Sequence, residues 1–201
     1  MDRRRVLKKI GYGSAAMVVT PQIINMLHSC KSNLNKYLPV FFANNQFQFV
    51  SKIMDLIIPK TDIPSAIELK LPEFLDNYIA VVMNQNDKET ILRRTNNFIK
   101  LILNETKKNS SMEINSNDLS TKLKKYLLAS DKQIESWEEA PKSQELEVYN
   151  YLIQIRSLTL NAFRLNEYIG EKVLAYDPIP GDRKVCLDLK KTTGGKRWSL
   201  L

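Results

Sequence analysis

Histidine is nearly absent from this chain of 201 residues. The single histidine, His28, lies within the first thirty residues, so residues 31–201 contain none. Without an imidazole, residues 31–201 cannot form a Ser-His-Asp triad, and they lack the side chain that proteins use most often to bind transition metals. The sequence therefore excludes a triad hydrolase in this region and argues against a histidine-based metal centre.

Cysteine and glycine are also scarce. The two cysteines, Cys30 and Cys186, have neither the spacing of a haem attachment motif nor that of an iron–sulfur cluster. No Gly-x-Gly-x-x-Gly motif follows a strand pattern, and Gly194-Gly195-Lys196 lacks the first glycine of a phosphate-binding loop. We therefore expect no cofactor and no metal ion in this chain.

The basic excess is concentrated at the start of the chain. Residues 1–29 hold five basic residues against Asp2, so they account for +4 of the net charge of +8 and leave +4 for the remainder. The lysine pairs of the remainder are isolated from one another, whereas nucleic-acid binding requires a concentrated basic surface with stacking aromatic residues. We expect no nucleic-acid partner.

The first thirty residues have the features of a cleavable export signal. Arg3 and Arg4 precede a short, weakly apolar segment at 10–19, and the small residue Ser29 precedes Cys30. This order is typical of exported proteins, and the arginine pair favours the twin-arginine route. That route carries folded proteins, so the chain can bring along a partner that has no signal. We expect a location in the periplasm or on a periplasm-facing membrane surface.

A retained membrane-spanning helix is the alternative for this segment. Such a helix needs about 20 mostly apolar residues, whereas Pro21, Gln22 and Asn25 interrupt the run. Length therefore favours the signal over the anchor.

The two cysteines each have two interpretations. Leu27-His28-Ser29-Cys30 resembles a lipoprotein cleavage box, which would make Cys30 the lipidated first residue and hold the chain at a membrane surface. Otherwise Cys30 is an ordinary cysteine near the end of the signal. Cys186 is either a buried thiol or one half of a disulfide to another subunit.

The remainder has the apolar periodicity of helices. After a polar tether at 31–40, a helical domain is expected at 41–175, because apolar residues recur at steps of three and four and no alternating strand pattern occurs. The predicted helices cover 41–58, 71–82, 86–102, 119–127, 130–140 and 143–168. We expect an all-α helical bundle, with Thr61 and Asp62 in a turn at a helix end and Pro72 in a first helical turn.

The C-terminal tail, 176–201, has a different composition. Pro178 and Pro180 exclude a helix at the start of the tail, and 185–189 is expected to be a short strand or an extended arm. Such a tail packs either on its own core or on a partner. The candidate interface residues are Tyr176, Asp177, Pro178, Pro180, Gly181 and Trp198.

Four stretches of the sequence, taken together and in order, are specific enough to indicate a protein family. They are Arg3-Arg4; Ile57-Ile58-Pro59-Lys60-Thr61-Asp62-Ile63-Pro64-Ser65-Ala66; Leu71-Pro72-Glu73-Phe74-Leu75-Asp76; and Tyr176-Asp177-Pro178-Ile179-Pro180-Gly181 followed by Cys186 and Gly195-Lys196-Arg197-Trp198. In this order they resemble the gluconate 2-dehydrogenase subunit 3 family, the small subunits of membrane-associated sugar dehydrogenases. The chain departs from the family at Ser65 and Val185, where the family favours glycine.

The resemblance implies a non-catalytic role. Small subunits of this family accompany a flavoprotein of the glucose–methanol–choline (GMC) oxidoreductase type, which holds FAD and oxidises the sugar, and a cytochrome c subunit often receives the electrons. The small subunit is expected to stabilise the flavoprotein and to supply its twin-arginine signal. The histidine base of the reaction would belong to the flavoprotein, so no catalytic residue is expected in this chain.

Two other functions remain open. An independent enzyme would have to use carboxylates such as Asp62, Glu73 or Asp177, but their spacing does not mark a catalytic pair. A free-standing, lipid-anchored periplasmic binding protein fits the same N-terminus, and co-purification with a flavoprotein distinguishes it from a small subunit.

Overall fold

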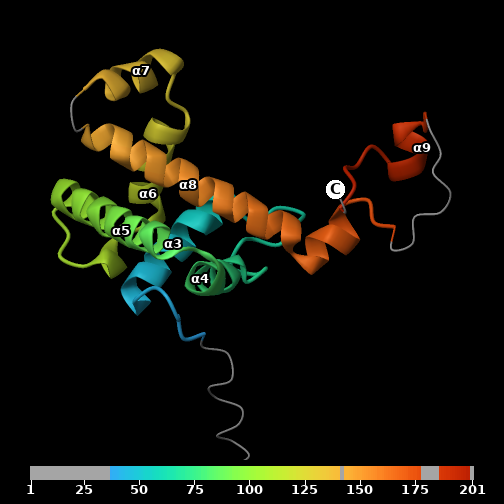
Figure 1. The fold of residues 1–201 in the computed structure, drawn as a ribbon, viewed down its shortest axis with the longest axis horizontal. Coiled ribbons are helices and arrows are strands. Elements are labelled where there is room, and N and C mark those ends of the chain that lie inside the picture. The colour runs from blue at the N-terminus through green and yellow to red at the C-terminus, as the bar shows by residue number, and fades with distance from the viewer. Residues whose placement is uncertain (1–36, 141–142, 178–185, 200–201) are drawn as a thin grey trace, which may run out of the picture. The chain divides into compact units, whose positions relative to one another are not determined.

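The computed structural model describes residues 37–140, 143–177 and 186–199 (Figure 1). The chain divides into two units, Met1–Leu38 and Pro39–Leu201, and the elements described below belong to the second. Several residues singled out in the sequence lie outside the described ranges: Arg3, Arg4, Cys30, Pro178, Pro180 and Gly181. Their predicted roles stay predictions.

The described part of the chain is helical and contains no strand, which confirms the predicted all-α class. The elements are α3 (Asn44–Ile57), α4 (Leu71–Val82), α5 (Gln85–Thr106), the 3₁₀ turn η1 (Ser111–Glu113), α6 (Ser116–Leu127), α7 (Asp131–Glu139), α8 (Gln144–Leu165), the π-helical turn η2 (Ile169–Val173) and α9 (Leu189–Thr193).

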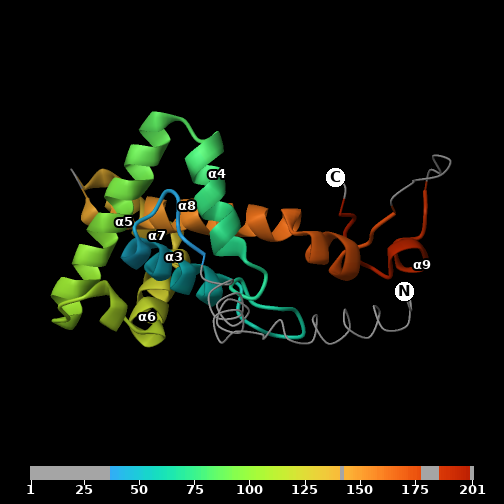
Figure 2. The same ribbon diagram turned by 90° about the horizontal axis from the view of Figure 1, so that it is seen from below.

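Helix α8 is the central element of the helical body. It packs against α3, α4, α5, α6, α7 and η2, and Figure 2 shows α4 and α5 both crossing it. Its buried residues Tyr151, Leu152 and Ile155 join a core with α3, α5 and α6, while Ala162, two turns further on, joins a second core with α3 and α4. One long helix therefore carries both parts of the core.

Most helix starts follow local signals. Pro72 lies in the first turn of α4, where its missing N–H removes no helical hydrogen bond. Ser130 pairs with Gln133 at the start of α7, and the Ser143 hydroxyl accepts a hydrogen bond from the Leu146 N–H (3.1 Å) at the start of α8. The predicted place of Pro72 in a first helical turn is confirmed, and α7 and α8 begin directly after Ser130 and Ser143, the first residues of two predicted ranges.

Three helix starts differ from the prediction. Helix α6, predicted from residue 119, begins at Ser116 after the cap Asn115, whose side chain accepts from the Asp118 N–H (2.9 Å). Helix α5, predicted from residue 86, begins at Gln85 after the cap Asn84, whose side chain accepts from the Asp87 N–H (2.9 Å). Helix α3 begins at Asn44 and not at Phe41, since the segment before it is held by a tertiary contact that no local pattern reveals.

That contact is the buried carboxylate of Asp76 in α4. Asp76 is fully buried and accepts hydrogen bonds from the backbone N–H groups of Val40 (2.6 Å), Phe41 (3.2 Å) and Phe42 (2.9 Å). A buried carboxylate is tolerated only when donors replace the water that it has lost. Three consecutive N–H groups provide that replacement, so residues 40–42 remain non-helical and enter the body against α4.

A buried tyrosine should make stability pH-dependent in the alkaline range. Burial raises the pKa of Tyr151 above its ordinary value of 10.0, because the core disfavours a phenolate. A raised folded-state pKa leaves the stabilising contribution complete below about pH 10 and removes it as pH increases further. We expect urea unfolding between about pH 10 and 11.5 to show a loss of roughly 1 kcal/mol per pH unit that Tyr151→Phe lacks. Equal slopes in the two proteins would contradict this assignment.

Candidate functional site

The end of the chain returns to the helical body. The Ala175 N–H donates to the Arg197 carbonyl oxygen (2.9 Å), and the Ser199 N–H donates to the Ala175 carbonyl oxygen (3.0 Å), which forms an isolated parallel bridge between Ala175 and Trp198. Residues 197–199 therefore lie beside Ala175, two residues after the end of η2, and the two hydrogen bonds hold them there.

The predicted strand or extended arm at 185–189 is wrong at its C-terminal end, because Leu189 begins α9. Asp188 caps this helix by accepting from the Lys191 N–H (2.9 Å), and the chain leaves it through Gly194 (φ 65°) and Gly195 (φ 83°). A side-chain cap at Asp188 is a local signal that the sequence contained. The positive φ angles explain the glycine pair, since glycine adopts them without strain.

Cys186 is exposed, so the buried-thiol interpretation is wrong for this structure. Its φ of 59° places it in the left-handed region beside α9. The alternative, a disulfide to another subunit, stays a prediction.

A groove lies between α4, α8 and the returning tail. Its volume is about 340 Å³, and we call it the α4–α8 groove. It is lined by Phe74, Leu75 and Tyr78 of α4, by Leu158, Asn161, Ala162, Arg164 and Leu165 of α8, and by Arg197 and Ser199 of the tail. Leu75 and Ala162 are buried, whereas Phe74 and Leu165 are 44% and 72% exposed. The groove thus has buried apolar groups beneath it and exposed apolar groups at its edges.

The apolar surface continues along α4 beyond the groove. Val81 and Val82 are 80% and 61% exposed. At 100° per residue, Val81 lies within about 20° of Phe74 around the helix, and Tyr78 lies about 40° from it. One side of α4 is therefore in the core, and a second side presents apolar groups outward. Sequence periodicity placed these residues on a helix but could not distinguish the two sides.

The residues predicted to form a partner interface are only partly described. Tyr176 and Asp177 are exposed. Trp198 is half-buried, and its neighbours in the sequence, Arg197 and Ser199, both line the groove. Thr61 and Asp62 form a local turn, in which the Ile63 N–H donates to the Thr61 hydroxyl (3.3 Å) and the Thr61 N–H donates to the Ile63 carbonyl (3.1 Å). This is the predicted turn after the first helix.

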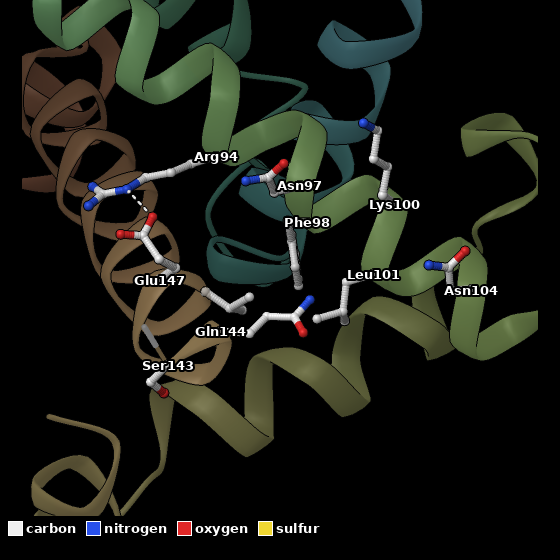
Figure 3. Close-up of a pocket in the computed structure, with 10 residues that line it drawn as sticks. Arg94, Asn97, Phe98, Lys100, Leu101, Asn104, Ser143, Gln144 and Glu147 are labelled. Atoms are coloured by element: carbon white, nitrogen blue, oxygen red, sulfur yellow. Dashed lines mark hydrogen bonds and ion pairs between the residues drawn. The ribbon is translucent and has the colours of Figure 1, made fainter. Parts of the chain in front are cut away.

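A second cavity, of about 360 Å³, lies between α5 and the start of α8 (Figure 3). Two of its charged groups form an ion pair, since Arg94 Nε lies 3.2 Å from Glu147 Oε2, and Arg93 Nη1 of the same helix lies 3.4 Å from that oxygen. Arg94 also donates to Gln154 Oε1 (3.3 Å), and the Ser143 hydroxyl caps α8. These contacts connect α5 to α8, so the cavity is explained by packing between helices.

The described ranges contain neither a candidate metal-binding cluster nor a candidate membrane-spanning helix. No group of three or more histidine, cysteine, aspartate or glutamate side chains is placed to hold a metal ion there. None of the helices described here is long and apolar enough to cross a membrane.

The comparisons with known proteins give one finding. The family model for gluconate 2-dehydrogenase subunit 3 matches residues 44–181, which is more than half of the chain. The match begins at the first residue of α3, includes α4 and α8, and ends at residue 181. No curated protein and no solved structure matches the chain. The resemblance inferred from the four sequence stretches is confirmed.

Proposed function

The chain belongs to the gluconate 2-dehydrogenase subunit 3 family, and on that premise we propose that it is the non-catalytic small subunit of a periplasm-facing, FAD-dependent dehydrogenase complex. The single observation that carries the proposal is the family match over residues 44–181. The catalytic subunit is a GMC-type flavoprotein that binds FAD and oxidises a sugar or polyol. A cytochrome c subunit is a candidate electron acceptor in the same complex.

The role of the small subunit is physical. By binding only the folded flavoprotein, it shifts the folding equilibrium of that partner towards the native state by mass action. Its twin-arginine signal then exports the two proteins together. The absence of histidine from residues 31–201 agrees with this division of labour, since general-base chemistry would be left to the flavoprotein. The exposed apolar side of α4 supports a role in protein association.

Purification of the native protein tests this function. We expect the chain to co-purify with one large subunit that shows flavin absorbance and sugar or polyol dehydrogenase activity, and we expect the separated small subunit to show neither. Turnover by the isolated small subunit would contradict the proposal. Recovery of the chain alone from native membranes would instead favour a free-standing, lipid-anchored binding protein.

A further inference from the structure

We propose that the α4–α8 groove is the surface on which the dehydrogenase subunit docks, and that its occupant is an apolar segment of that subunit flanked by carboxylates. This inference rests on the proposed function and adds to it the surface and the chemistry of recognition. It differs from the prediction that the contact is formed by tail residues, namely Tyr176, Asp177, Pro178, Pro180, Gly181 and Trp198, because α4 and α8 provide most of the surface.

The apolar part of the argument comes from exposure. Val81, Val82 and Leu165 are each more than 60% exposed, and Phe74 is 44% exposed. Isolated apolar residues on a surface need no explanation, but a contiguous apolar side of a helix beside an apolar groove is typical of an association site. Burial of such side chains against a partner removes apolar surface from water, which favours association.

The charge of the groove selects the occupant. Arg164 and Arg197 are the only basic residues that line the groove, and no aspartate or glutamate lines it. Neither arginine forms an ion pair with any residue in the described ranges. Guanidinium groups bind carboxylates in a bidentate geometry, so a segment with Asp or Glu beside its apolar residues would complement both components of the surface.

The groove is held in place before any partner arrives. Its α4 and α8 walls belong to helices that pack against each other, and its third wall is fixed by the bridge between Ala175 and Trp198. A preformed groove reduces the entropic cost of association. A concave surface also fits an inserted segment of a protein better than the flat surface of a bilayer, which makes a protein the preferred occupant.

Affinity measurements with the full chain and the purified flavoprotein subunit test the proposal. We expect Val81→Glu and Arg164→Glu each to weaken binding about tenfold or more, because one places a charge on the apolar surface and the other reverses a recognition charge. Leu128→Glu is the control for Val81, since the two residues are 78% and 80% exposed. Arg156→Glu is the control for Arg164, because Arg156 is an exposed arginine of α8 that does not line the groove. Both controls should bind within about twofold of the wild type.

The outcomes separate the two proposals. If the wild-type chain does not bind the flavoprotein, the proposed function fails, and the docking surface fails with it. If the wild type binds and the groove variants bind equally well, only the docking surface is overturned. Loss of binding to phosphatidylglycerol vesicles in Val81→Glu, with unchanged flavoprotein binding, would assign the surface to lipid and would also overturn the inference. If Val81→Glu does not reach the wild-type melting temperature, Val82→Ser provides the same test, with Met112→Ser as its control at 62% exposure.

Discussion

Asp76→Asn lowers the free energy of unfolding by about 3–5 kcal/mol, an expectation based on the loss of charge-assisted hydrogen bonds in a buried site. The native carboxylate accepts from three consecutive backbone N–H groups, those of Val40, Phe41 and Phe42. Asparagine has one acceptor oxygen, and its amide NH₂ would face donors. At least one buried N–H group would then lose its partner, and the attachment of residues 40–42 to α4 would weaken.

Urea unfolding of the two proteins, followed by circular dichroism, measures this difference. Asp62→Asn is the matched control, because Asp62 is an exposed aspartate in the turn after α3, and its replacement should change stability by no more than about 0.5 kcal/mol. A loss below about 1 kcal/mol in Asp76→Asn would mean that the three N–H groups find other acceptors at little cost. The assignment of Asp76 as the residue that fixes the entry of the chain would then be wrong.

Replacing both Arg3 and Arg4 by lysine should abolish export of this chain and of the flavoprotein. The twin-arginine route depends on the arginine pair, and lysine keeps the charge but not the planar guanidinium. Because we propose that the flavoprotein is exported only in complex with this chain, its activity should disappear from the periplasm and remain in the cytoplasm. Cell fractionation followed by a dehydrogenase assay and immunoblotting of both subunits measures the effect.

Arg5→Lys is the control for the export experiment. Arg5 follows the Arg3–Arg4 pair, so its replacement changes the same chemistry in the same segment without removing the pair. We expect normal export in this variant. Normal export of the flavoprotein in the double variant would contradict co-transport, while leaving the docking surface on α4 and α8 to be judged by its own affinity measurements.

The sequence predicted the starts of α4, α7 and α8, where the signal was local. A helix start depends on one side chain and the next few N–H groups, so Pro72, Ser130 and Ser143 could be recognised from their neighbours alone. The resemblance to the subunit 3 family was local too, since it rested on short ordered stretches, and the family model matches residues 44–181, which contain those at 57–66, 71–76 and 176–181.

The caps of α6 and α9, at Asn115 and Asp188, were local signals that the prediction missed. Other errors occurred where a distant residue decided the conformation or the exposure. Phe41 had the spacing of a helical residue, but its N–H is held by a carboxylate 35 positions away. Phe74 and Val82 have the helical spacing of the buried Leu75, but which apolar positions are buried depends on where α8 crosses α4. For Cys186, exposure could not be inferred from residue type.

The amino-acid sequence by itself determined the helical class, the starts of α4, α7 and α8, and the family, because hydrophobic period, capping and motif order are properties of neighbouring residues. Only the tertiary structure decided that Asp76 is a buried anchor and that residues 197–199 complete a groove with α4 and α8. The physical reason is that burial and hydrogen-bond partners depend on contacts between segments far apart in the chain, and a single sequence does not specify which of its apolar surfaces meet.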